Sequence, residues 1–418
     1  MNRRELLGTI ATLPLLSLAS ASSRAFAQDA KEVPIGVLFP MSGPSAQVGV
    51  DARHACETAA EIVNTAQNFD MITARSVGLK GLGGAKIRLI FADHQSDPQK
   101  GRAEAERLIT QDKVVAVLGC YQSSVSATVG AVAERYQIPF LCADSSSPSL
   151  QQKKMRFFFR PAPQDEMFSA AMFDFMDAQR KKGKKIETLA LFYEDTIFGV
   201  DSSNIQRKLA GERGYKVVAE VKYRSNSPSL TAEVQQLKSA DADVLMPSTY
   251  TTDAILLVRT MAELGYKPRN MVAQAAGFAD KVLYDAVGDK LQGVISRASF
   301  SLDLARKRPF VATVNDMFKA RANRDLNDNS SRELIGVSIL ADAISRAGST
   351  DGEKIRAALA ATNIPGAETI MPWARVRFDA EGQNPDATPV LLQWVGDRFV
   401  TIFPDDAAIA EPIWPMNP

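Results

Sequence analysis

The sequence predicts an α/β protein built from two lobes, and three observations support this fold class. Apolar strand-like runs alternate with segments of helical spacing, which is the order that parallel sheets require. The alternation runs through two blocks of similar size and restarts after residue 161. The chain has 418 residues, of which 45% are hydrophobic, so it can bury two separate cores.

The first block begins with a nearly unbroken apolar run from Val33 to Phe39, which predicts a buried strand. A turn rich in Pro and Gly ends this strand. A helix is expected from about Ala46 to Ala66, because its apolar residues fall on one face. The second strand is expected at Lys86 to Ala92. Asp97 and Pro98 are residue types that favour the start of a helix, so the next helix begins there.

Further strands and helices follow in the same alternation. Two strands complete the first block, at Val114 to Gly119 and at Ile138 to Cys142, with a helix through Arg135 between them. For the second block we predict strands at Leu189 to Tyr193, Lys216 to Glu220, Val244 to Pro247 and Met271 to Gln274. Helices are predicted near Met167 to Gln179, Ala254 to Leu264 and Ile335 to Arg346.

The first 27 residues have the pattern of a cleaved signal peptide. Arg3 and Arg4 precede an apolar run from Leu6 to Leu18, and small residues follow up to Ala27. The run is too short to span a membrane, and no later stretch reaches the roughly 18 apolar residues that spanning requires. We therefore expect export with cleavage before Gln28, and both the general secretory and the twin-arginine route remain open.

Composition excludes several classes of partner and scaffold. Positive and negative side chains nearly cancel, with 49 Lys and Arg against 48 Asp and Glu. No basic stripe is present, so nucleic acid and membrane surfaces are poor candidate partners. Three cysteines, Cys56, Cys120 and Cys142, are too few for a disulfide scaffold. A bridge between Cys120 and Cys142 and free buried thiols both remain open.

The sequence has no recognisable catalytic or metal-binding motif. It contains no nucleophile elbow, Walker loop or dinucleotide fingerprint. Its two histidines, His54 and His94, do not stand at the spacing of metal ligands, and each is expected to be a surface residue. We therefore expect no metal, no cofactor and no enzymatic activity.

Hydroxyl-bearing residues follow the third and fourth predicted strands. Ser123 and Ser124 lie where a helix begins, so they can either cap that helix or bind a carboxylate together with its free N–H groups. Ser145 and Ser146 follow the next strand and have the same two interpretations. Because open parallel sheets bind ligands beyond the carboxyl ends of their strands, the two turns predict a polar pocket.

A series of different short motifs lies along the whole mature chain. They include Ile35 to Pro44, Asp97-Pro98, Val114 to Gly119 with Ser123-Ser124, Phe159-Arg160, Tyr193 to Asp195 with Phe198-Gly199, Glu263 to Gly265, and Phe378 to Gln383. In order and spacing these motifs resemble the type I periplasmic solute-binding proteins of ABC importers, specifically the leucine/isoleucine/valine-binding group. Each motif is only moderately specific, but together they span essentially the whole mature chain.

The resemblance implies two Rossmann-like lobes with parallel central sheets joined by three crossovers. Residues 28–161 and 299–369 would form lobe 1, and residues 162–298 and 370–418 would form lobe 2. The protein would be a periplasmic monomer that closes around a small-molecule ligand and delivers it to ABC permease subunits in the inner membrane. The alternative is a sensor, in which the same fold presents its closed state to a receptor or regulator.

The resemblance also implies where the ligand binds. Lobe 1 would hold the ligand's carboxylate with Ser123, Ser145 and Ser146. We expect the neighbouring side chains of the same turns to take part, namely Tyr121, Gln122 and Asp144. Lobe 2 would close over the other side with Tyr193, Phe198, Thr249 and Tyr250.

At Gln274 the sequence departs from the amino acid binders, which have an acidic residue there for the ligand's ammonium group. A neutral amide cannot pair with that charge as a carboxylate does. Either Asp144 or another acid replaces it, or the ligand has no ammonium group. Asp144 also has a plain alternative role as an N-cap. An amino acid is the first expectation, and an aromatic or aliphatic carboxylate or a short amide is the alternative.

Overall fold

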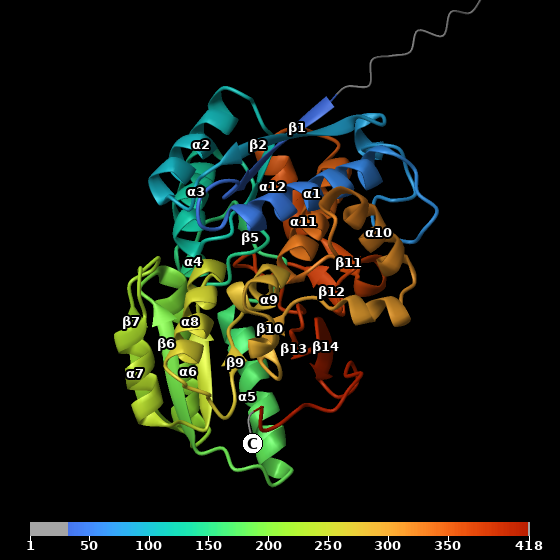
Figure 1. Ribbon diagram of the computed structural model, residues 1–418. Coiled ribbons are helices and arrows are strands. Elements are labelled where there is room, and N and C mark those ends of the chain that lie inside the picture. The colour runs from blue at the N-terminus through green and yellow to red at the C-terminus, as the bar shows by residue number, and fades with distance from the viewer. Residues whose placement is uncertain (1–31, 417–418) are drawn as a thin grey trace, which may run out of the picture. The chain divides into compact units, whose positions relative to one another are not determined.

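The computed structural model describes residues 32–416, which form two lobes with helices on both faces of their sheets (Figure 1). The predicted signal peptide lies outside the described residues. Among residues 32–416, no helix is both long and apolar enough to cross a bilayer. The predicted α/β fold class is confirmed.

The sheet of the first lobe has the strand order β2-β1-β3-β4-β5, and all of its neighbouring strands run parallel. Its strands are β1 (Glu32–Phe39), β2 (Lys86–Asp93), β3 (Ala116–Gly119), β4 (Phe140–Cys142) and β5 (Phe158–Phe159). The predicted strands match β1 to β4, although β3 and β4 begin two residues later than expected.

Helices cover both faces of this sheet. They are α1 (Ala46–Asn64), α2 (Pro98–Thr110), α3 (Ser123–Tyr136), α4 (Ser149–Gln152), α10 (Phe310–Ala322), α11 (Asp328–Ala347) and α12 (Gly352–Ala360). Ile35 and Val37 belong to the core cluster on the side of α1 and α11, whereas Leu38 belongs to the cluster on the side of α2 and α3. Burial on both faces explains why the β1 sequence is apolar almost without interruption.

The second lobe contains two sheet segments joined by a parallel bridge between Leu245 and Met271. One segment is parallel, in the order β7-β6-β8, and consists of β6 (Thr188–Glu194), β7 (Lys216–Tyr223) and β8 (Val244–Ser248). The other has the order β14-β13-β10-β9, with β9 (Val272–Ala273), β10 (Ile295–Ala298), β13 (Val390–Val395) and β14 (Arg398–Phe403). Strands β13 and β14 run antiparallel at its edge, a feature that the sequence did not predict.

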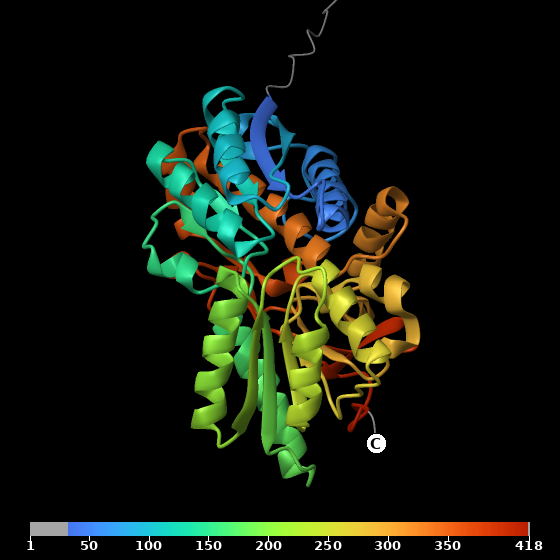
Figure 2. The ribbon, with the colours of Figure 1, turned by 60° about the vertical axis from the view of Figure 1, so that its left-hand side comes forward.

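Helices again pack on both sides of the second-lobe strands (Figure 2). They are α5 (Asp165–Lys181), α6 (Ile197–Glu212), α7 (Thr231–Ala240), α8 (Thr251–Glu263) and α9 (Lys281–Val287). Short 3-10 turns lie at η1 (Lys80–Leu82), η2 (Gly277–Ala279), η3 (Gly288–Leu291), η4 (Leu302–Arg306) and η5 (Gly366–Glu368).

The chain crosses between the lobes after β5, after β10 and before β13. The first and last crossings are tied together, because the backbone N–H of Arg160 donates to the Gly382 carbonyl and that of Asn384 donates to the Arg160 carbonyl. The segment from Ile370 to Ala387, with the short pair β11 (Asn363–Pro365) and β12 (Arg375–Arg377), contributes to the core of the first lobe. The predicted lobe boundaries stay a prediction, and we propose moving the last one from residue 370 to just after Ala387.

Two side chains differ from their sequence-based expectations. His94 is fully buried rather than on the surface, and its Nδ1 accepts a hydrogen bond from the Ser96 N–H at 3.1 Å. Burial disfavours the charged ring and lowers the pKa of His94 to about 4. Cys120 and Cys142 are free and buried, which selects the unbridged alternative.

Candidate functional site

Loops at the carboxyl ends of strands from both lobes surround a small cavity of about 10 Å³. The turns after β3 and β4 approach it from the first lobe, and those after β6, β8 and β9 approach it from the second. This is the edge at which parallel sheets position ligands. We call this space the cleft cavity.

The structure brings most of the predicted site residues to the cleft cavity. Those that line it are Tyr121, Ser123, Asp144, Ser145, Ser146, Phe198 and Tyr250. They belong to turns that are far apart in the sequence. The turns meet because each follows a strand of a parallel sheet, and the carboxyl ends of parallel strands lie at the same edge.

Four predicted site residues do not line the cleft cavity. Gln122 lines a neighbouring rim cavity, where its side-chain amide donates to the hydroxyls of Ser45 and Ser96. The Tyr193 hydroxyl instead contacts Glu220 at 3.2 Å, because alternate residues of β6 face opposite sides of the sheet.

The remaining two lie beneath the cavity wall. Thr249 is buried, and its carbonyl accepts from the Gly277 N–H. Gln274 is also fully buried, and its amide donates to Asp165 at 3.0 Å. It is Ala276, two residues further along the same turn, that reaches the cavity.

Three aromatic rings form one wall of the cleft cavity and connect the lobes. The ring of Tyr250, from the second lobe, lies with its centroid 4.9 Å from that of Tyr121 in the first lobe. It also lies 5.3 Å from the ring of Phe198. Such pairs add roughly 0.5–1.5 kcal/mol each beyond their burial, so they favour contact between the lobes.

Buried ion pairs form the opposite, polar wall. Arg332 contacts Asp144 Oδ1 at 2.6 Å and Asp328 Oδ2 at 2.8 Å, and Arg297 contacts Asp328 at 3.3 Å. The Arg297 guanidinium also lies over the ring of Phe168, 3.7 Å from its centroid. Burial lowers the pKa of Arg297 to about 10, which leaves it charged at neutral pH. Since each charge has a partner, this wall remains ionic while buried.

Two donors on this wall lack a partner. Within residues 32–416, neither Nε of Arg297 nor Nδ2 of Asn329 has a hydrogen-bond acceptor, although both side chains are buried and line the cleft cavity. Buried donors without acceptors are costly, so the site is suited to a ligand that carries acceptor oxygens.

A carboxyl pair lies directly behind this wall. Burial and the neighbouring Asp144 carboxylate raise the pKa of Glu333 well above its usual range. The carboxyl oxygens of Glu333 and Oδ2 of Asp144 have no hydrogen-bond partner among residues 32–416. A proton on Glu333 would allow the two carboxyl groups to hydrogen-bond to each other. Asp144 Oδ1 contacts Arg332, whereas Asp144 Oδ2 is buried without such a partner in this part of the chain.

The serine turns have different roles. The Ser145 hydroxyl donates to the Cys120 carbonyl at 2.8 Å, so it joins the turns after β3 and β4. Ser146 Oγ lies 3.5 Å from Arg297. Ser123 is the first residue of α3, whose N-cap is Gln122 and has no side-chain cap. The capping role considered for Ser123 is therefore not observed, and its hydroxyl lines the cleft cavity.

Sequence reasoning missed Arg297, Asn329 and Arg332. The helix that contains Asn329 and Arg332 was expected to begin only at Ile335, whereas α11 begins at Asp328. A usable signal existed, because an arginine next to a long apolar helix has to be paired if that helix is buried on all sides. Arg297 carried no comparable signal, since its partner Asp328 is distant in the sequence.

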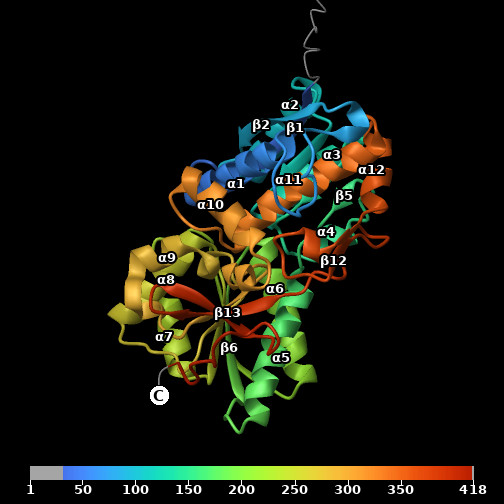
Figure 3. The ribbon, with the colours of Figure 1, turned by 90° about the vertical axis from the view of Figure 1, so that its right-hand side faces the viewer.

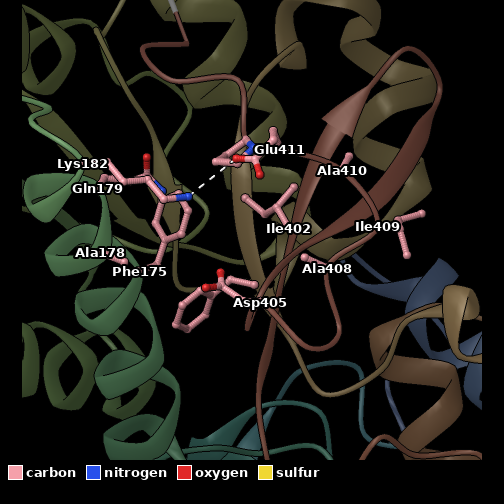
Figure 4. Close-up of a pocket in the computed structure, with 12 residues that line it drawn as sticks. Phe175, Ala178, Gln179, Lys182, Ile402, Asp405, Ala408, Ile409, Ala410 and Glu411 are labelled. Atoms are coloured by element: carbon pink, nitrogen blue, oxygen red, sulfur yellow. Dashed lines mark ion pairs between the residues drawn. The ribbon is translucent and has the colours of Figure 1, made fainter.

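A larger cavity of about 490 Å³ lies elsewhere, between α5 and the segment that follows β14 (Figure 4). Phe175 and Ile402 contribute to its walls, and Lys182 contacts Glu411 across it at 3.6 Å. It shares no lining residue with the cleft cavity and does not lie at the carboxyl ends of the parallel strands. The smaller cleft cavity is therefore the better candidate site.

Comparison with known families agrees with this geometry. Residues 32–398 match a family described as periplasmic binding protein. Leu/Ile/Val-binding protein homolog 7 of Brucella suis is 25% identical over 409 residues, which cover 95% of this chain and 98% of that protein.

Solved structures share the fold. The leucine binding protein LivK from Thermotoga maritima gives a TM-score of 0.77 at 22% identity, covering 90% of this chain and 99% of that one. A solute binding protein from Rhodopseudomonas palustris in complex with 3,4-dihydroxy benzoic acid gives a TM-score of 0.72 at 17% identity, covering 88% and 95%. At these identities, the two structures establish the fold and leave the ligand of this chain open.

Proposed function

Because the chain belongs to the periplasmic binding protein family, we propose that it is the solute-binding component of an ABC importer. It binds a small carboxylate-bearing metabolite by hinge closure. The observation that carries this proposal is the cleft cavity, whose lining comes from the strand ends of both lobes. A ligand there contacts both lobes, so it stabilises the closed form more than the open form.

An amino acid, of branched-chain type, is the first candidate ligand. The relatives named as Leu/Ile/Val-binding homologs support it. The ligand's carboxylate would accept from Ser123 and the first N–H groups of α3, where the helix dipole favours negative charge. Since Gln274 does not reach the cavity, the acceptor for the ammonium group would be Asp144.

An aromatic carboxylate is the second candidate, and two observations favour it. The rings of Tyr121, Phe198 and Tyr250 offer faces for a flat ligand. A structure of the same fold holds 3,4-dihydroxy benzoic acid. Unpartnered donors of Arg297 and Asn329 would bind its carboxylate, and no acid would be needed for an ammonium group.

A thermal-shift screen with leucine, 3,4-dihydroxybenzoate and a short amide tests this proposal. A ligand at 100 times its Kd stabilises the folded protein by about 2.7 kcal/mol, so its melting temperature rises measurably. A rise with one class and none with the others identifies the ligand class. If no carboxylate or amide raises the melting temperature at millimolar concentration, the proposal is wrong.

The proposed setting is the periplasm, reached through the predicted signal peptide over residues 1–27. There the protein would act as a monomer, without a cofactor or catalysis, and deliver its ligand to ABC permease subunits in the inner membrane. A sensor of the same fold is the alternative, and adjacent genes for permeases and ATPases would decide for transport.

A further inference from the structure

A second cavity, of about 320 Å³, lies next to the crossover that follows β10. Its walls come from both lobes: η4 and the start of α11 from the first, and β13, β14 and the start of α9 from the second. Figure 3 labels α9, α11 and β13, three of the elements that contribute to its walls. We call it the hinge pocket. Its volume lies within the range of roughly 300–1,000 Å³ that is usual for small-molecule sites.

The floor of the hinge pocket is aromatic and apolar. Trp394, only 1% exposed, stacks on Tyr284 at 4.9 Å and lies 3.8 Å from Phe399 between ring centroids. Phe300 and Leu392 are buried beside it. A floor of this kind accepts a flat apolar body, because burial of apolar surface contributes about 25 cal/mol per Å².

Donors without partners surround this floor. Nε1 of Trp394 is buried and has no hydrogen-bond acceptor among residues 32–416. Arg306 and Arg398 line the pocket, are both exposed, and form no ion pair within the same described part of the chain. Guanidinium groups bind carboxylates strongly and in a defined geometry, so these two arginines are available to bind an anion.

Four acidic residues also line the pocket, and two of them, Asp325 and Asp328, are offset by cationic partners. Asp303 accepts from the Thr401 N–H and hydroxyl at 3.1 and 2.9 Å. Asp325 accepts from Asn315 and Lys319 at 2.9 and 3.0 Å. Asp328 is paired with Arg297 and Arg332, and Asp397 is exposed in the β13–β14 turn.

The hinge pocket is separate from the cleft cavity, since the two share no lining residue. Asp328 lies between them, lining the hinge pocket and pairing with both arginines of the cleft cavity. We propose that the hinge pocket is a second ligand site, for a small aromatic carboxylate or a similarly flat monoanion. Its carboxylate contacts Arg306 and Arg398, and its ring rests on the aromatic floor.

Calorimetric titration of the protein with benzoate tests this site. The double variant Arg306→Ala/Arg398→Ala is expected to weaken benzoate binding roughly tenfold or more, because two charge-assisted contacts are lost. Arg102→Ala, which removes an exposed and unpaired arginine from α2, is the matched control and leaves binding unchanged. Ser123→Ala alters the cleft cavity alone and also leaves hinge-pocket binding unchanged.

The outcomes separate the two sites. If benzoate also occupies the cleft cavity, the wild-type protein binds two equivalents, and the arginine double variant loses one of them. Loss of binding in Ser123→Ala with full binding in the double variant overturns the proposal, because benzoate then occupies only the cleft cavity. Absence of any benzoate binding at millimolar concentration also overturns it. Leu392→Phe, which reduces the pocket volume without removing a charge, should block the site as a second, independent variant.

Discussion

At the residue scale, the polar wall of the cleft depends on Arg332. Besides its two ion pairs, it donates to the Asp144 carbonyl at 2.7 Å and to Asn329 at 2.7 Å. Arg332 therefore holds in place both the strand-end turn after β4 and the first turn of α11. Removing one partner of a buried ion pair is expensive, about 3–5 kcal/mol, so we regard Arg332 as part of the scaffold of the site.

Ser123→Ala is expected to weaken ligand binding by roughly 1–3 kcal/mol, because a buried carboxylate oxygen loses its hydroxyl donor. Ser124→Ala is the matched control, since Ser124 lines the neighbouring rim cavity rather than the cleft cavity. Calorimetry with the ligand found by the screen measures both. Equal affinities of Ser123→Ala and wild type would remove Ser123 from the proposed site.

Glu194→Gln is expected to change the pH dependence of stability. Burial is the main reason that the pKa of Glu194 is raised from 4.5 to about 8. A raised folded-state pKa gives stability that is fully present below about 4.5 and is lost as the pH rises towards about 8. The glutamine variant lacks this loss, so its unfolding free energy should increase relative to wild type across that range.

Denaturant unfolding at several pH values measures this difference, with the exposed Glu263→Gln as the control. A constant difference between Glu194→Gln and wild type over the whole range would show that Glu194 is ionised in the folded protein. The control should differ from wild type by a small constant amount, because an exposed carboxyl keeps similar surroundings on unfolding.

At the element scale, α11 supplies the polar groups of the site from its first turn. Asn327 caps the helix in a capping box, accepting from the Ser330 N–H at 2.9 Å while the Ser330 hydroxyl accepts from the Asn327 N–H at 3.0 Å. The box allows the helix to begin before its apolar run. As a consequence Asp328, Asn329 and Arg332 project from a rigid helical turn rather than from a loop.

Gly199→Ala tests how α6 presents Phe198 to the cleft. A Cβ at Gly199 would lie 2.2 Å from the Glu194 carbonyl oxygen, so alanine is expected to destabilise the protein by about 1–3 kcal/mol. Gly211 lies in the same helix with nothing within 4 Å of its Cβ position. Gly211→Ala should therefore be neutral or stabilising by up to about 1 kcal/mol. Thermal unfolding measures the stability of both variants. Equal melting temperatures would contradict the close approach of Gly199 to the Glu194 carbonyl.

At the scale of the whole molecule, the proposed binding by hinge closure depends on contact between the lobes. Besides the ring pair of Tyr121 and Tyr250, the Thr252 hydroxyl donates to the Pro44 carbonyl at 2.8 Å across the cleft. These contacts join the two lobes in this structure, and opening of the cleft would break them. Their loss shifts the population towards the open form and lowers the apparent affinity for ligand.

Tyr250→Ala is expected to weaken ligand binding roughly tenfold or more, because two ring contacts in the closed form are lost. Tyr193→Phe is the control, since the Tyr193 hydroxyl contacts Glu220 outside the cleft cavity. Calorimetry of the two variants separates the two tyrosines. A comparable loss of ligand affinity in Tyr193→Phe would show that the Tyr193 hydroxyl takes part in binding.

Local patterns in the sequence were enough to predict much of the fold. The strand predicted from the apolar run of β1 and the helix start predicted at Asp97 are both confirmed, because strand burial and helix capping depend on neighbouring residues. The serine turns after β3 and β4 were found for the same reason: a loop at the carboxyl end of a parallel strand has a predictable position. The edge hairpin of β13 and β14 was missed although its pairing is local, since Val395 lies opposite Arg398 across the turn of Gly396 and Asp397.

Long-range packing determined the rest of the candidate site. Arg297 and Asp328 are 31 residues apart, and nothing local relates them before β10 and α11 meet. Gln274 and Tyr193 stand at suitable places in the sequence, but the strand turns direct one into the core and the other away from the cavity. A side chain's partner is set by where the whole backbone brings it, whereas its preference for a strand, a cap or a turn comes from its immediate neighbours.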